Sequence, residues 1–162
     1  MVLLGWAVGP GSTPLDDWFQ RANGSALGRL LFFTDQRTVA VILLGTVVLA
    51  AYRRRWLLAG MVVATPVVAV VLSRIFKELF GREKGGTLAY PSGHTTLMVV
   101  VLGMAILVVG AKVRVLMAAI VWALLGIIGQ AVTYHYFTDA VGGLLLGSSL
   151  ACATFAVVER NV

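Results

Sequence analysis

Residues 115–132 read VLMAAIVWALLGIIGQAV, a run of eighteen residues without a charged side chain. A helix needs about 20 mostly apolar residues to cross the hydrocarbon core of a bilayer. Similar runs occupy Trp56–Leu72, His94–Val109 and Ala140–Val158, and the shorter run Thr38–Tyr52 can extend back into amphipathic residues. The sequence therefore predicts an all-α integral membrane protein, a bundle of five or six transmembrane helices.

The composition supports the same class. Of 162 residues, 59% are hydrophobic and 12% are charged, whereas a soluble domain carries about 45–50% apolar and about 25% charged residues. This excludes a water-soluble globule and a disordered chain, and the length suits a single domain over residues 1–162. The net charge of +6 favours membrane lipids or an anionic substrate as partners, and not nucleic acid. The single cysteine, Cys152, cannot form an internal disulfide.

The first 37 residues have a different pattern. Met1–Gly9 is apolar but too short to span, and it lacks the basic region of a signal peptide. It is either a separate segment or the remnant of a first span. Pro14–Phe33 mixes aromatic and charged residues, which predicts an amphipathic helix in the membrane interface or, alternatively, a truncated first span. We therefore predict an N-terminal interfacial region, 1–37, and a transmembrane core, 38–162.

Five spans bring three polar clusters to the same side of the membrane: Lys77–Lys84, Tyr90–Thr95 and His135–Asp139. The side that carries Arg53–Arg55 has six Lys and Arg, and the side with the clusters has seven. The positive-inside rule therefore does not decide the orientation. The concentration of cations in one loop calls for another explanation.

The middle cluster has the features of an anion site. Ser92 is a good N-cap, and Gly93 lets a ligand approach the backbone closely. The helix that follows offers unpaired N–H groups and the positive end of its dipole. His94 stands beside this helix start, where it can donate a proton. The alternative is an ordinary N-cap with an interfacial histidine.

His135 and Asp139 are four residues apart, and hence on one face if the stretch is helical. The carboxylate can hold one imidazole nitrogen and leave the other free as a base or nucleophile. The alternatives are a pair that merely caps a span end and a metal site that adds His94. The cations of the Lys77–Lys84 cluster disfavour the metal site, because they would repel a metal ion.

The loop cations have two interpretations. Lys and Arg at a helix end commonly extend toward lipid phosphates, and we assign this role to Arg74. For Lys77, Arg82 and Lys84, the neighbouring anion site and histidine pair favour a bound phosphate.

These residues resemble the type 2 phosphatidic acid phosphatase family, whose motifs are KxxxxxxRP, PSGH and SRxxxxxHxxxD. Pro91-Ser92-Gly93-His94 matches the middle motif completely, and His135-x-x-x-Asp139 matches the end of the third. Lys77 begins the first motif, in which Lys84 and Gly85 replace the arginine and proline. The third motif's arginine falls on Gly129, with Gln130 beside it. Lysine keeps the charge but lacks the bidentate fork of arginine.

The resemblance implies a lipid phosphatase that needs no metal and no cofactor. His135 attacks phosphorus to form a phosphohistidine, Asp139 orients His135, and His94 protonates the leaving oxygen. The resemblance assigns phosphate binding to five residues: Lys77, Arg82, Lys84, Ser92 and Gly93.

It also implies a multi-pass protein of the plasma membrane with the site on the extracytoplasmic face. The candidate substrates are polyprenyl phosphate or diphosphate, phosphatidic acid and phosphatidylglycerol phosphate. A non-hydrolytic protein that binds or translocates lipid phosphates and a lipid phosphotransferase are the alternative functions. No sequence feature predicts an oligomeric state.

Overall fold

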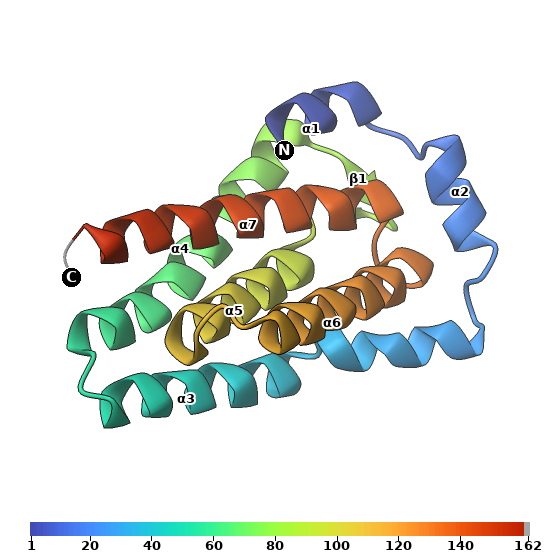
Figure 1. Ribbon diagram of the computed structural model, residues 1–162. Coiled ribbons are helices and arrows are strands. Elements are labelled where there is room, and N and C mark those ends of the chain that lie inside the picture. Colours follow the sequence, from blue (N-terminus) through green and yellow to red (C-terminus); the bar gives the residue numbers. More distant parts are fainter. Residues whose placement is uncertain (161–162) are drawn as a thin grey trace.

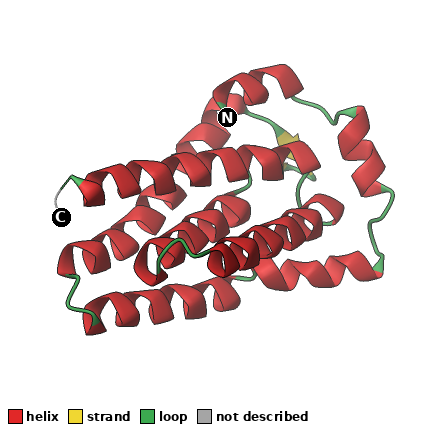
Figure 2. Ribbon diagram, viewed as in Figure 1, coloured by secondary structure: helices red, strands yellow, loops and turns green. Residues whose placement is uncertain are grey.

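The computed structural model describes residues 1–160, and their regular structure is almost entirely helical (Figures 1 and 2). In chain order, the elements are α1 (Val2–Val8), α2 (Pro14–Gln20), the 3-10 helix η1 (Ala26–Thr34), α3 (Gln36–Tyr52), α4 (Trp56–Phe80), β1 (Glu83–Lys84), β2 (Thr87–Leu88), α5 (Gly93–Val109), α6 (Val113–Val132) and α7 (Phe137–Glu159). The all-α prediction is confirmed in its main point, and the short hairpin β1–β2 is an addition to it.

Helix α5 lies at the centre of the bundle. It contacts α3, α4, α6 and α7, and eight of its residues are buried. Its sequence is apolar on every side, and a helix of that kind is stable only when it is enclosed. α5 packs most extensively against α7. The helices approach so closely that α7 carries glycines at the contact. A Cβ on Gly143 would lie 2.6 Å from the Ser92 carbonyl oxygen, and one on Gly147 would lie 2.8 Å from Val99.

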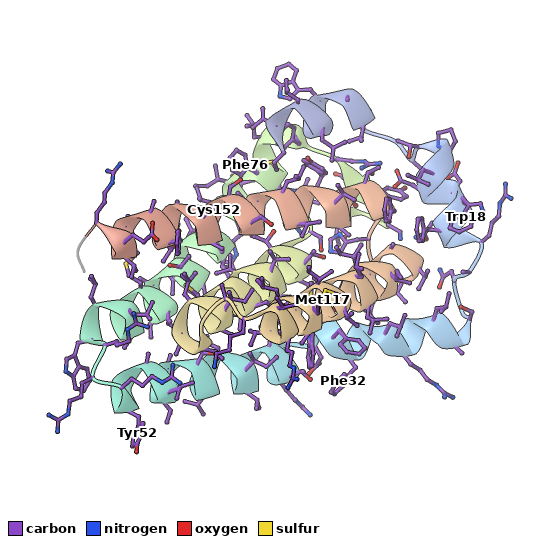
Figure 3. All side chains as sticks on the ribbon, viewed as in Figure 1. Trp18, Phe32, Tyr52, Phe76, Met117 and Cys152 are labelled. Carbon is purple, nitrogen blue, oxygen red and sulfur yellow. The ribbon has the colours of Figure 1, made fainter. Side chains whose placement is uncertain are left out.

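The outer faces of the other long helices are apolar. Large exposed side chains include Val41 and Leu44 on α3, Val67 on α4 and Met117 on α6. Four helical stretches are long and apolar enough to cross a membrane: Ala26–Tyr52, which joins η1 to α3, Trp56–Phe80, Val113–Val132 and Phe137–Glu159. α5 is shorter, with 17 residues. Exposed apolar faces suit a lipid environment, and Figure 3 shows Tyr52 projecting outward at the far end of α3.

Two boundaries differ from the sequence prediction. The second span was expected to end at Leu72, but α4 continues to Phe80 and ends only at Gly81, whose φ of 59° gives a left-handed cap. Lys77 therefore belongs to a helix and not to a loop. The chain then turns back through β1 and β2, with positive φ at both Gly85 and Gly86, as a tight hairpin turn requires.

The prediction of one amphipathic helix over Pro14–Phe33 is wrong. α2 ends at Gln20, a turn with Gly24 at φ 80° follows, and η1 starts at Ala26. η1 packs along α6 and continues toward α3 along one edge of the bundle (Figure 1). Its residues thus pack against the helical core.

Candidate active site

A pocket of about 430 Å³ opens where five segments meet: the start of α3, the last turns of α4, strand β2, the start of α5 and the loop between α6 and α7. Its lining includes Arg74, Lys77, Gly93, His94, Tyr134 and His135. These residues are up to 61 positions apart in the sequence, so only the packing of the helices brings them together. Four of the predicted site residues therefore share one pocket: Lys77, Gly93, His94 and His135.

His135 lies just before α7 and is 7% exposed. Its Nδ1 atom lies 3.7 Å from Oδ2 of Asp139 and has no hydrogen-bond partner among the described residues. The expected histidine and carboxylate therefore lie side by side without a hydrogen bond between them, and His135 precedes the helix that carries Asp139.

Asp139 is completely buried and is held from two sides. Its Oδ2 atom accepts a hydrogen bond from the Tyr136 amide (3.0 Å), which caps α7. Its Oδ1 atom accepts one from Arg82 (2.8 Å). These contacts fix the carboxylate in place beside His135.

The PSGH segment turns the chain into α5. Ser92 is fully buried and caps the helix, since its Oγ accepts hydrogen bonds from the amide and hydroxyl of Thr95. Its amide donates to the Asp139 carbonyl, which ties the start of α5 to α7. His94 follows with an exposed side chain, and its ring centre lies 6.3 Å from that of His135.

Arg82 does not line the pocket. Its guanidinium is 1% exposed, and each of its nitrogens donates to the protein: Nη1 to Asp139 and Thr138, Nη2 to Asp16 and the Gly11 carbonyl, and Nε to Gly11. Two carboxylates, Asp16 and Asp139, flank it at 2.8 Å. This guanidinium has no donor left for a phosphate.

Asp16 is the second anchor of this network, and sequence reasoning missed it. It accepts hydrogen bonds from Thr13 and Thr138 as well as from Arg82. Burial on its own raises the pKa of Asp16, but these hydrogen bonds outweigh burial and hold the pKa below its ordinary value of 3.8. Asp16 is therefore ionised at neutral pH.

Lys84 also points away from the pocket. Its Nζ atom donates to the carbonyls of Thr133 (3.0 Å) and His135 (2.9 Å) and lies over the Tyr136 ring. Burial lowers its pKa below the ordinary value of 10.5, although the negative charges of Asp139 and Asp16 oppose the shift. Lys84 thus holds the backbone of the loop that carries His135.

Arg74 is the pocket residue that sequence reasoning assigned elsewhere. It lies three residues before Lys77, on the same face of α4, and both line the pocket. Lys77 donates to the Leu88 carbonyl (2.7 Å), whereas Arg74 is exposed and has no hydrogen bond or ion pair within residues 1–160. The three-residue spacing could have signalled this position once α4 was known to continue past Leu72.

Gly129 occupies the place of the third-motif arginine, and the structure shows why it has no side chain. A Cβ there would lie 2.5 Å from the backbone carbon of Leu30 and 2.7 Å from the Leu31 nitrogen. The backbone of η1 therefore covers the surface from which an arginine would extend. Next to it, Gln130 is buried and donates to the Thr34 hydroxyl (2.7 Å).

Among residues 1–160, no three His, Cys, Asp or Glu side chains gather in a way that could hold a metal ion. The charged groups that line the pocket are cations, so the pocket as built attracts an anion.

No curated protein and no solved structure matches the chain. The family model of the PAP2 superfamily matches residues 76–162, more than half of the chain, and this range contains Lys77, both histidines and Asp139. The match and the four apolar helices identify an integral membrane protein, and the chain belongs to the PAP2 superfamily.

Proposed function

We propose that this chain is a membrane lipid phosphatase that hydrolyses a lipid phosphomonoester or diphosphate through a phosphohistidine. One observation carries the proposal: a single pocket unites two histidines and the start of helix α5 with a lysine and an arginine, and this arginine has no partner among residues 1–160. Members of the PAP2 superfamily are typically phosphatases, and this pocket contains the groups that such a reaction needs.

The reaction has two steps. An imidazole nitrogen of His135 attacks phosphorus, a P–N bond forms, and the bond from phosphorus to the leaving oxygen breaks. His94 gives a proton to that oxygen, which leaves as an alcohol or as a phosphate monoester. Water then attacks phosphorus and gives a proton to His94, a P–O bond forms, and the P–N bond breaks, which releases phosphate and frees His135. The 6.3 Å between the ring centres allows one phosphoryl group to contact both rings.

The supporting residues divide into two groups. Lys77, Arg74 and the Gly93 amide would hold the phosphoryl oxygens, because fixed cations and a helix start stabilise the charge that develops in the transition state. The second group would support the site without contacting the phosphate. In this group, Arg82 orients Asp139, Lys84 holds the loop of His135, and Ser92 shapes the start of α5. This modifies the assignment made from the motifs alone.

We further propose that the protein lies in the plasma membrane with this pocket on the extracytoplasmic face. The turn at Arg53–Arg55 would then be cytoplasmic, in agreement with the positive-inside rule. The cations on the opposite side would serve the substrate and the fold, which explains why they do not obey that rule.

The first test is phosphate release by the detergent-purified protein with excess chelator. Phosphatidic acid, phosphatidylglycerol phosphate and a polyprenyl diphosphate form the panel. We expect His135→Ala to abolish release and His94→Ala to slow it by about 100-fold or more, as loss of a general acid does. Tyr52→Phe, at the exposed far end of α3, is the matched control and should keep full activity. Release by right-side-out vesicles from an added short-chain substrate tests the orientation.

Hydrolysis that survives His135→Ala would overturn the proposed nucleophile. Gly129 in place of an arginine supports a second candidate function, binding or translocation of lipid phosphates without turnover. Vanadate binding without phosphate release from any lipid would select that function. Transfer of phosphate to an added lipid alcohol, instead of to water, would identify a phosphotransferase.

A further inference from the structure

A second pocket, of about 360 Å³, adjoins the active-site pocket. Three residues line both of them: Gln36, His94 and Tyr134. The second pocket alone is lined by Thr34 and Asp35, at the junction of η1 and α3, and by Gln130 on α6. No motif of the family includes Thr34 or Asp35, so the sequence comparison assigns no role to this pocket.

The two pockets have opposite charge. Arg74 and Lys77 line the first, whereas the described residues that line the second include no lysine or arginine and one carboxylate, Asp35. A second phosphate group would be attracted to the first pocket and repelled from the second.

The walls of the second pocket offer hydrogen-bond acceptors. Oδ1 of Asp35 accepts the amides of Arg37 (3.0 Å) and Thr38 (3.2 Å), and its Oδ2 accepts no hydrogen bond within the described chain. Gln130, which lines the same pocket, is 1% exposed, and its Oε1 is a buried acceptor with no partner among residues 1–160. Acceptors without a donor are suited to hydroxyl groups, because a hydroxyl can donate to them.

The position of His94 relates this pocket to the reaction. His135 lines only the first pocket, whereas His94 lines both. In a phosphoryl transfer, the attacking and leaving atoms are roughly in line on opposite sides of phosphorus. With His135 as nucleophile and His94 as proton donor, the leaving group extends past His94 and into the second pocket.

We propose that the second pocket binds the alcohol portion of the substrate and that this alcohol carries free hydroxyl groups, as a glycerol or sugar headgroup does. This inference rests on the proposed phosphatase function and narrows its substrate class. A diphosphate would place the negative charge of its leaving phosphate beside Asp35 and is disfavoured. The preferred substrate is a phosphomonoester on a hydroxyl-bearing headgroup.

The test changes only the charge of the second pocket. Asp35→Asn keeps a side chain that can cap α3, since asparagine is as good an N-cap as aspartate, and removes the negative charge. Asp17→Asn, an exposed change on α2, is the matched control. The measured quantity is kcat/KM for phosphatidylglycerol phosphate divided by that for farnesyl diphosphate.

We expect the wild type to favour phosphatidylglycerol phosphate. Asp35→Asn should shift the ratio toward the diphosphate by about fivefold, the size expected for one solvent-exposed charge pair, and Asp17→Asn should leave the ratio unchanged. Turnover that favours the diphosphate, or a ratio unaffected by Asp35→Asn, would overturn this inference while the phosphatase function stands.

A binding measurement separates the two proposals. Glycerol 3-phosphate and inorganic pyrophosphate are soluble probes of the same pockets and require no turnover. If no lipid is hydrolysed but glycerol 3-phosphate binds more tightly than pyrophosphate, with the preference reduced in Asp35→Asn, the second pocket is supported and the phosphatase function fails. Equal or inverted affinities in the wild type would reject the hydroxyl-binding pocket.

Discussion

Arg74 lines the active-site pocket, whereas two of the cations predicted to bind phosphate do not. The active-site pocket contains Lys77, but Arg82 and Lys84 are turned toward buried acceptors, and Gly129 has no side chain. A phosphoryl group would meet one cation without Arg74 and two with it. A guanidinium also offers two parallel N–H groups to two phosphate oxygens, which an ammonium cannot do.

Replacement of Arg74 tests this role. We expect Arg74→Ala to weaken vanadate binding and to lower kcat/KM by about tenfold or more, the usual effect of losing a charged hydrogen bond. Arg74→Lys should recover only part of the loss, because the bidentate geometry is missing. Arg29→Ala, on the exposed face of η1, is the control for a general loss of positive charge. If the Arg74→Ala and Arg29→Ala variants behave alike, Arg74 contacts only lipid headgroups.

At the scale of elements, the contact of η1 with α6 decides the shape of the site. η1 lies on α6 so closely that Gly129 has no room for a Cβ. The same contact brings Thr34 to Gln130 and Asp35 to the edge of the second pocket. The missing arginine and the extra pocket thus have one structural cause.

Gly129→Ala tests this contact. We expect it to destabilise the protein by about 1–3 kcal/mol, because overpacking forces backbone to move. Gly60→Ala on α4 is the matched control, since nothing lies within 4 Å of its Cβ position. A helix favours alanine over glycine by about 0.5–1 kcal/mol, so the control should be neutral or stabilising. Thermal unfolding in detergent measures both, and equal stability of the two variants would contradict the packing of η1 on α6.

In the whole molecule, one buried ionic network joins the N-terminal segment to α7, the helix that carries Asp139. Asp16 comes from α2 and Asp139 from α7. Arg82 lies directly after Gly81, the C-cap of α4. Removing one partner of a buried ion pair leaves an uncompensated charge, which is more harmful than the pair is beneficial. The N-terminal segment therefore stabilises the position of Asp139.

We expect Asp16→Asn to lower the free energy of unfolding by about 3 kcal/mol and to reduce activity. The control is Asp17→Asn, at the exposed neighbouring residue, which should change the free energy of unfolding by less than about 0.5 kcal/mol. The pKa of Asp16 is lowered in the folded protein, so its contribution is complete above its unfolded pKa and is lost as the pH falls through the folded value. Wild-type stability should therefore decline below about pH 4, and Asp16→Asn should flatten that decline. Equal unfolding of the Asp16 and Asp17 variants would exclude the network as a stabilising element.

The sequence by itself determined the membrane class, the approximate positions of the long apolar helices and the four-residue spacing of His135 and Asp139, because hydropathy and motif spacing are local properties. It placed Lys77, Gly93, His94 and His135 in one site, and all four line the pocket.

Only the tertiary structure decided which cations face the substrate. Arg82 turns inward because Asp16, 66 residues away in sequence, lies 2.8 Å from it, and Arg74 faces the pocket because α4 continues for two more turns. Side-chain direction near a helix end depends on which buried acceptors pack against it. Those acceptors come from distant segments that no local pattern identifies.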